Sequence, residues 1–587
     1  MVKQLMKSIR EFKLATILTP TFVVGEVIIE ALIPFLISLL INDIKAGCDL
    51  SVILGYAWKL VVLSLLSLLC GYLAGIYCAE ASTGFAKNLR YDIFSNIQKF
   101  SFSNIDKFSS ASLVTRLTTD IQNVQMAFMM IIRTAVRAPL NLIFSFTMAY
   151  IMGGSMAVIF LIIIPFLGIG LYLIVRTVMP VFKKGFPLFD KITRIVEENV
   201  KGIRVVKSFV REDYEINKFD ETSNDIRKMF TRAEQIIALN NPLMQISIYA
   251  VMLFVLMFGS EMIIKTNATS LDVGQLSTLM TYGFQIMVSL MMLSMVFVMI
   301  TFSEESCKRI VEVLNEKSSI TSKENAITEV KDGSIDFDHV RFKYSPTAER
   351  PVLENIDVHI KSGETIGIIG GTGSAKSSFV QLIPRLYDVT EGTVRVGKED
   401  VRDYDLVTLR DSVAMVLQKN VLFSGTIADN IRWGNKDATL EEVKHVCHLA
   451  CADEFIEQMP DGYDTWIEQG GTNVSGGQKQ RLCIARALLK QPKILIMDDS
   501  TSAVDTKTDA IIRKAMKEYI PEITKIIIAQ RTSSVEDADR IIVLDGGKID
   551  AIGTSEELLK TNQIYREVYL SQNKQGTEEI VEEGGVR

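Results

Sequence analysis

The chain has 587 residues, of which 48% are apolar, and its mean hydropathy is +0.24. This length exceeds what one ordinary hydrophobic core supports, and the hydropathy excludes a purely soluble protein. The net charge of −6 argues against nucleic acid as a partner, because phosphate binding needs clustered cations in excess. We therefore expect at least two domains, one of them in a lipid bilayer.

Six apolar stretches are each long enough to cross a bilayer as a helix, which takes about 20 residues. They lie near 14–41, 52–79, 130–152, 155–178, 240–264 and 273–302. The connections after the first, third and fifth stretches are short and nearly free of Lys and Arg, whereas the long connections after the second and fourth are basic. By the positive-inside rule, both termini and both long loops are cytoplasmic, which predicts a multi-pass protein of the cytoplasmic (plasma) membrane.

The long cytoplasmic loops carry apolar residues at helical spacing, so we expect the spans to continue as helices into the cytosol. Past residue 316, apolar runs shrink to strand length and alternate with amphipathic helices, which is typical of an α/β domain. The predicted organisation is a transmembrane domain over 1–316, a linker over 317–329, an α/β domain over 330–572 and an acidic tail over 573–587.

The stretch "GIIGGTGSAKSS" follows a buried strand and opens a helix, as a phosphate-binding loop does. In such a loop, Lys376 reaches the β and γ oxygens of the nucleotide and the Ser377 hydroxyl binds Mg²⁺. Ala375 stands where the pattern has glycine. An alanine there costs little only if it lies at the helix start with an ordinary φ. We predict that this loop binds ATP.

Other motifs complete the predicted site. The strand "KILIMD" ends in Asp498, a carboxylate placed to hold Mg²⁺, and "VSGGQ" opens an amphipathic helix that forms a second anion-seeking helix start. Tyr344 is placed to stack on a base, although plain packing also explains it. The predicted ATP-binding residues are Tyr344, Gly370, Gly371, Thr372, Gly373, Ser374, Ala375, Lys376, Ser377, Ser378 and Gln418. The predicted metal ligands are Ser377, Gln418 and Asp498.

The phosphate loop, Gln418, "VSGGQKQR", "KILIMDDSTSAVD" and "IIIAQR", in this order, resemble the nucleotide-binding domain of ATP-binding-cassette (ABC) proteins. Six spans followed by this domain resemble the half-transporter exporters. The resemblance implies a helical six-span domain of the type I ABC exporter fold, fused to an α/β P-loop nucleotide-binding domain. It also implies that two such domains pair head to tail, each ATP lying between one loop and the other chain's signature, here Ser475, Gly476, Gly477 and Gln478.

Two further positions depart from the family pattern. Asp499 replaces the usual catalytic glutamate, which sets the carboxylate back by on the order of 1 Å. Gln530 replaces the switch histidine and cannot relay a proton. With Ala375, these changes resemble the degenerate-site subunit of bacterial heterodimeric multidrug ABC exporters, which holds ATP and lends "VSGGQ" to a partner half-transporter. A homodimeric lipid or drug flippase with two weak sites is the alternative, followed by an ATP-gated channel.

The predicted substrate is a hydrophobic or amphipathic small molecule. Glu26 and Glu30 lie one helical turn apart inside the first span, where a carboxylate is costly. They contact a cationic substrate, or they pair with Arg133 or Arg137 of the third span or form a hydrogen bond to a neighbouring helix. In the sixth span, Met291 and Met295 belong to a methionine stripe, which suits either an adaptable substrate surface or ordinary helix packing; that stripe comprises Met287, Met291, Met295 and Met299.

Overall fold

The structure is a computed structural model that describes residues 1–267, 269–499 and 504–572. The predicted acidic tail, 573–587, lies outside these residues, as do positions 500–503 of "KILIMDDSTSAVD". The chain divides into two compact units, Met1–Gln98 with Ser109–Glu316, and Lys99–Phe108 with Lys317–Arg587. Lys99–Phe108 therefore belongs to the second unit, although the sequence placed it in the transmembrane domain.

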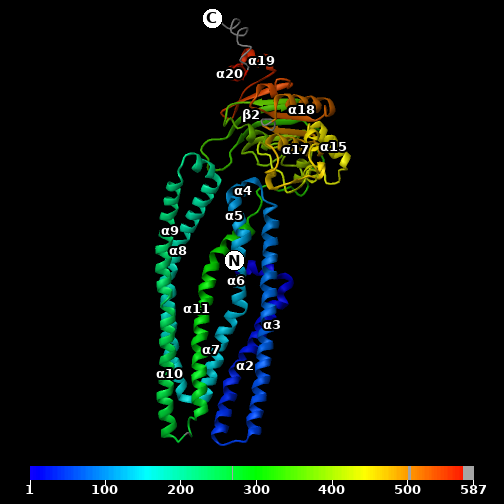
Figure 1. Ribbon diagram of the computed structural model, residues 1–587. Helices are drawn as coiled ribbons and strands as arrows, with labels where there is room; N and C mark the ends of the chain where they lie inside the picture. Colours follow the sequence, from blue (N-terminus) through cyan, green and yellow to red (C-terminus); the bar gives the residue numbers. More distant parts are fainter. Residues whose placement is uncertain (268, 500–503, 573–587) are drawn as a thin grey trace. The chain divides into compact units, whose positions relative to one another are not determined.

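The first unit consists of long helices (Figure 1). The helices that contain the predicted spans are α2 (Lys13–Lys45), α3 (Leu50–Ile97), α7 (Thr134–Gly153), α8 (Val158–Ser208), α10 (Asn240–Lys265) and α11 (Val273–Asn315). The remaining helices of this unit are α1 (Val2–Leu5), η1 (Met6–Phe12), α5 (Ser110–Thr115), η2 (Arg116–Asp120), α6 (Ile121–Ile132), η3 (Gly154–Ala157) and α9 (Glu212–Ile237). As expected for the long loops, α3 and α8 continue well beyond the apolar stretches.

Within the described residues, five helical stretches are long and apolar enough to cross a membrane. One of them, Ser110–Val181, holds both the third and the fourth predicted span. The chain turns between these two spans at Gly154, whose φ of 51° is open to glycine, and the short helix η3 follows directly. The difference from the six predicted spans thus arises from a turn so tight that it keeps a helical hydrogen-bond pattern.

The second unit is built on two sheets. A six-stranded sheet has the order β12-β11-β3-β10-β9-β6, with β12 antiparallel to β11 and the other neighbours parallel. Its strands are β3 (Thr365–Ile369), β6 (Val413–Val416), β9 (Ile494–Asp498), β10 (Thr524–Ile528), β11 (Arg540–Asp545) and β12 (Lys548–Gly553). An antiparallel sheet has the order β2-β1-β4-β5 and consists of β1 (Ile335–Phe342), β2 (Leu353–Ile360), β4 (Glu391–Val396) and β5 (Glu399–Asp400). A small pair joins β7 (Gly425–Thr426) and β8 (Trp466–Ile467).

Helices complete this unit. They are α4 (Phe102–Phe108), α12 (Lys376–Gln381), α13 (Leu406–Ser412), α14 (Ile427–Arg432), α15 (Leu440–Leu449), α16 (Asp453–Ile456), α17 (Gly476–Leu489), α18 (Thr506–Tyr519), α19 (Ser555–Thr561) and α20 (Gln563–Gln572). Strands β9 and β10 are buried along their whole length, as continuous apolar runs in parallel sheets are. Capping boxes, in which a polar N-cap and the third helical residue satisfy each other's backbone, begin α14, α15, α17 and α19.

Helix α4, from the connection between α3 and α5, packs on the α/β domain. The Tyr387 hydroxyl donates a hydrogen bond to Asp106 Oδ2 at 2.8 Å, and the Phe102 and Tyr387 ring centroids lie 5.9 Å apart. Asn104 Nδ2 also donates a hydrogen bond to the carbonyl oxygen of Lys317, 3.1 Å away, at the start of the segment that leads into the α/β domain. Helix α4 is thereby held by both polar and aromatic contacts within the second unit.

Candidate nucleotide-binding site

Four neighbouring strands of the six-stranded sheet position the predicted nucleotide site. Ile528 of β10 pairs with Ile368 of β3 on one side and with Asp498 of β9 on the other. The carboxyl ends of these parallel strands, and of β6 beside β9, therefore meet at one edge, where ligands bind in open α/β sheets. The phosphate loop follows β3, Gln418 follows β6, and Gln530 follows β10.

The phosphate loop connects β3 to α12 and is closed around Lys376. The Lys376 ammonium donates to the carbonyl oxygens of Gly370 and Gly371 at 2.8 and 2.9 Å, and to Ser374 Oγ at 3.3 Å. Burial lowers the pKa of Lys376, and the charges of the two aspartates after β9 oppose that shift. At Gly370 a Cβ would lie 2.1 Å from the Leu544 carbonyl oxygen, so only glycine fits there.

Ala375 caps α12 in the left-handed region, with φ 71° and ψ 22°. The condition under which an alanine would cost little here, an ordinary φ, is therefore not met. A left-handed L-residue costs roughly 1–2 kcal/mol because Cβ crowds the following carbonyl oxygen. Gly373, two residues earlier, has φ 84° and meets the same requirement with glycine. The loop therefore has a left-handed backbone at both positions, but a glycine stands at only one of them.

The predicted metal ligands include one buried carboxylate. Asp498 is 5% exposed. Burial raises the pKa of Asp498 and the charge of Asp499 adds to that, while a hydrogen bond with Ser377 and the charge of Lys376 lower it. Hydroxyl, carboxylate and amide oxygens are the hard donors that Mg²⁺ prefers, so this set fits the ion.

No cluster of three or more His, Cys, Asp or Glu side chains within the described residues could hold a metal alone. Mg²⁺ at nucleotide sites takes one or two carboxylates together with substrate phosphates. The residues present therefore fit an ion that arrives with a nucleotide.

The two remaining departures from the family pattern touch each other. Gln530 Nε2 donates to Asp499 Oδ2 at 2.8 Å, and Gln418 Nε2 approaches the same oxygen at 3.4 Å. Asp499 is 8% exposed and its φ is 47°. Its backbone N–H donates to the carbonyl oxygen of β10 at Ile528, 2.9 Å away, which fixes the residue against the neighbouring strand. One carboxylate oxygen of the candidate base is thus already an acceptor for side-chain amides.

Tyr344 lies at the edge of the site. Its hydroxyl is 2.8 Å from Ser378 Oγ in the first turn of α12, and its ring meets the ring of Tyr387 edge-on at 5.0 Å. The residue is 45% exposed. Its ring also meets the ring of Phe342 at 4.8 Å, so Tyr344 is packed against two aromatic neighbours. The role of Tyr344 in binding a base stays a prediction, as does that of Thr372, which lies exposed in the loop.

The signature begins a helix as predicted. Ser475 is the N-cap of α17; its Oγ accepts from the Gln478 backbone N–H at 3.3 Å, and its own N–H donates to Gln478 Oε1 at 2.9 Å. Gly476 and Gly477 form the first turn, and both Ser475 and Gly476 are exposed. The start of this helix is therefore open to an anion that approaches from outside the domain.

In the first unit, Arg137 of α7 pairs with both carboxylates of α2. Its Nη1 donates to Glu26 Oε1 at 3.0 Å and its Nη2 to Glu30 Oε1 at 2.7 Å. Of the two predicted arginine partners, Arg137 is the one that the structure pairs with them. The close approach needs Gly71 of α3, where a Cβ would lie 2.9 Å from Glu26 Oε1. Pairing, one of the two interpretations of these glutamates, is what the geometry shows.

The methionine stripe of α11 divides between two environments. Met287 is fully buried in the helix core, whereas Met291 and Met295 line a pocket of about 300 Å³ with side chains of α8. Met295 is 61% exposed. The two methionines among the residues predicted for the substrate pathway therefore border this pocket.

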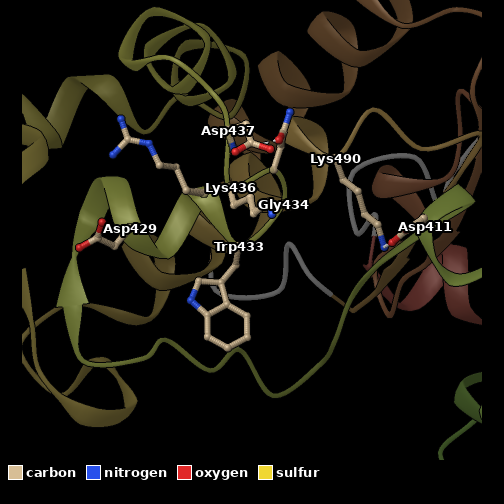
Figure 2. Close-up of a pocket in the computed structure, with 9 residues that line it drawn as sticks. Asp411, Asp429, Trp433, Gly434, Lys436, Asp437 and Lys490 are labelled. Carbon is tan, nitrogen blue, oxygen red and sulfur yellow. Dashed lines mark hydrogen bonds and ion pairs between the residues drawn. The ribbon is translucent and has the colours of Figure 1, made fainter. Parts of the chain in front are cut away.

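A larger pocket, of about 830 Å³, lies around the end of α14 and contains none of the predicted nucleotide residues (Figure 2). Lys490 and Asp411 lie on one side of it, 3.8 Å apart, and Trp433 stacks on Phe423 with ring centroids 4.2 Å apart. Trp433 is 63% exposed. The sequence motifs did not predict this pocket; an exposed tryptophan in "NIRWGN" has no pattern that separates it from a core tryptophan.

Comparisons with known proteins agree with this architecture. Residues 16–302 match the ABC transporter transmembrane region, and residues 353–502 match the ABC transporter family of ATP-binding domains. The chain is 34% identical over 554 residues to the uncharacterized ABC transporter ATP-binding protein YfiB of Bacillus subtilis, covering 94% of this chain and 96% of that protein. It is 30% identical over 521 residues to an ATP-dependent lipid A-core flippase of Photobacterium profundum, covering 86% and 88%.

Among solved structures, a bacterial Atm1-family ABC exporter with ATP bound superposes with a TM-score of 0.82. The match covers 96% of this chain and 98% of that chain at 24% identity, so it speaks for the fold alone.

Proposed function

This chain belongs to the ABC transporter family as an exporter, an ATPase coupled to transport, and on that premise we propose that it is the degenerate-site half of a heterodimer. Its own phosphate loop would hold Mg-ATP and hydrolyse it slowly. Its signature would complete the competent site of a partner half-transporter, in a bacterial cytoplasmic membrane with both termini in the cytoplasm.

The observation that carries this proposal is the bond between Gln530 and Asp499. A general base must accept a proton from the attacking water, and its oxygen must be within hydrogen-bond reach of that water. Asp499 Oδ2 instead accepts from Gln530 at 2.8 Å. The amide of Gln530 has no titratable proton to relay, so this pair can orient a nucleotide but is poorly suited to activating water.

The chain's binding residues support retention of ATP. Lys376 and Ser374 belong to the phosphate loop, and Ser377 and Asp498 would hold Mg²⁺. The bound ion would supply charge neutralisation of the phosphates. Phosphate binding in such loops depends on backbone N–H groups and lysine rather than on the base, so substitution of the base need not weaken it.

We propose that small amphipathic molecules are the cargo. The pocket beside Met291 and Met295 is apolar and lined by flexible side chains, which adapt to varied ligands. A relative named as a lipid A-core flippase makes an amphipathic lipid the second candidate cargo, and a homodimer the second candidate assembly. Glu26 and Glu30, already paired with Arg137, are then better placed to hold α2 against α7 than to bind a cation.

The test is ATPase activity in proteoliposomes, measured for the chain alone and with a partner half that has Glu and His at the two degenerate positions. In the mixed dimer, Ser475→Ala should lower turnover by about tenfold or more, because it removes a donor to the competent site. Asp499→Asn in the same dimer should leave turnover nearly unchanged.

Thr439→Ala is the matched control, since Thr439 caps α15 with the same capping-box geometry away from the signature. Rapid turnover by the lone chain that Asp499→Asn abolishes would instead establish the homodimer with two hydrolysing sites.

A further inference from the structure

A second pocket in the α/β domain lies away from the nucleotide edge of the sheet. It has a volume of about 620 Å³ and is lined by the first residues of β3 and β10, by one face of α18 and by the segment before β11. Thr365 begins β3 and Lys525 is the second residue of β10. Because both strands carry the nucleotide residues after their carboxyl ends, this pocket is at the opposite edge of the sheet. Its size is that of a small-molecule site.

Cationic side chains predominate in the lining. They are Arg513, Lys514, Lys517 and Lys525, against the carboxylates of Asp537 and Asp539. Asp537 accepts from Arg513 Nη1 at 2.9 Å, and Asp539 accepts from the backbone N–H of Thr365 at 2.8 Å. Lys514 lies 3.8 Å from Glu518 on its own helix. The lining carboxylates therefore already have donors, and their charges do not exceed those of the cations.

Lys517 and Lys525 form no ion pair among the residues that the structure describes, and Asp539 is the lining carboxylate whose charge acts on Lys525. Lys525 is 5% exposed, and its ammonium donates to the Ile523 carbonyl oxygen at 3.1 Å. A buried ammonium without a carboxylate is costly. Burial lowers the pKa of Lys525 and the charge of Lys517 adds to this effect, while Asp539 opposes it. An anion bound in the pocket would offset the cost of burying this ammonium.

We propose that this pocket binds a small soluble anion that carries two or more phosphate groups. Lysine ammonium groups bind phosphate as point charges, and two of them with an ion-paired arginine beside them match a ligand with several charged oxygens. Arg513 is already paired with Asp537 and with Asp509. Lys517 and Lys525 are therefore the groups left for a ligand, and a single carboxylate would pair with only one of them. The site is separate from the phosphate loop, so its occupancy does not depend on the proposed heterodimer or on hydrolysis.

The experiment is isothermal titration of inorganic tripolyphosphate into the full-length chain in detergent. The background variant is Lys376→Ala, which weakens binding at the phosphate loop. We expect one saturable site in this background, about tenfold or more weaker with Lys525→Met and several-fold weaker with Lys517→Gln. Lys507→Gln is the matched control, because Lys507 is an exposed lysine of α18 that does not line the pocket.

Methionine keeps the length and apolar stem of Lys525, so the thermal unfolding midpoint of Lys525→Met should not fall. This measurement separates loss of the site from loss of the fold. Absence of saturable binding in the Lys376→Ala background would overturn the proposal. So would equal weakening by Lys507→Gln and Lys525→Met, because that result means attraction to a basic surface in general.

Discussion

Ala375 has a left-handed backbone conformation that disfavours its methyl group. Removing that methyl group tests how much stability the conformation costs. The residue has φ 71°, where an L-residue pays roughly 1–2 kcal/mol and glycine does not. Glycine in turn loses about 0.5–1 kcal/mol more conformational freedom on folding than alanine. We therefore expect Ala375→Gly to stabilise the α/β domain by about 1 kcal/mol, measured as a higher midpoint in thermal unfolding of the full chain.

The same substitution in an ordinary helix should have the opposite sign. Ala510 is an exposed residue inside α18, so Ala510→Gly should destabilise by about 0.5–1 kcal/mol. If Ala375→Gly also lowers the midpoint, the left-handed conformation of this position is not the one that the protein adopts.

Some residue-scale features could not be predicted because they depend on neighbours that are distant in the chain. The motifs placed Asp499 and Gln530 in one half-site, but the bond between them depends on β9 and β10 being adjacent, which no local pattern encodes. The φ of Ala375 is likewise set by how the loop closes on Lys376. Patterns in the sequence identify the chemical groups, and the sheet order decides which of them meet.

At the scale of elements, an ion-paired triad joins two helices of the membrane domain. Arg137 of α7 faces Glu26 and Glu30 of α2, and Glu26 is 7% exposed. Removing the arginine leaves two carboxylates together in a poorly solvated place, and breaking a buried pair in this way costs about 3–5 kcal/mol. We expect Arg137→Gln to lower the thermal unfolding midpoint in detergent strongly.

A compensating variant separates charge from packing. With Glu26→Gln and Glu30→Gln added to Arg137→Gln, no charge remains to be buried, so most of the lost stability should return. A triple variant as unstable as Arg137→Gln alone would mean that the shape of the arginine, and not its charge, holds the helices.

Helix α4 contacts the α/β domain within the second unit through Asp106 and Phe102. Burial and the neighbouring Asp106 raise the pKa of Tyr387, so its hydroxyl stays a donor at neutral pH. Tyr387→Phe removes the hydrogen bond to Asp106 and keeps the ring beside Phe102. We expect the amount of substrate moved per ATP hydrolysed to fall several-fold, while ATPase activity changes little, because one net hydrogen bond contributes about 0.5–1.5 kcal/mol.

Tyr404→Phe is the control for the amount of substrate moved per ATP hydrolysed. Tyr404 is buried and its hydroxyl donates to the Val396 carbonyl oxygen at 2.8 Å, a bond within the α/β domain. This variant should lower stability by a similar amount and leave the transport-to-hydrolysis ratio unchanged. Equal transport-to-hydrolysis ratios for Tyr387→Phe and Tyr404→Phe would mean that Tyr387 has no part in coupling hydrolysis to transport.

The element scale also shows where helix prediction from apolar length is limited. The six predicted stretches were found, but the third and fourth run together because the turn at Gly154 is only as long as η3. Hydropathy reports the apolar character of a segment and not its direction. By contrast, the continuation of α3 and α8 beyond the apolar stretches followed from apolar residues at helical spacing.

At the scale of the whole molecule, the proposed asymmetry predicts which nucleotides a working dimer retains. In a dimer with two unlike sites, the one that uses this chain's phosphate loop should keep ATP, and the one that uses this chain's Ser475 should turn ATP into ADP. Rapid removal of free nucleotide during turnover, followed by chromatography of what stays bound, should therefore find both species on the heterodimer.

Variants of this chain should shift that composition in opposite directions. Asp499→Glu with Gln530→His restores the longer carboxylate and the imidazole, so the retained ATP should be replaced by ADP. Ser475→Ala should do the reverse, because the competent site loses its donor and its ATP persists. The two variants lie in different motifs of one domain and alter different nucleotides, so a shift in the same direction for both would contradict two unlike sites. A symmetric pair of slow sites retains ATP at both sites before any substitution, so Ser475→Ala would leave the composition unchanged and only Asp499→Glu with Gln530→His would alter it.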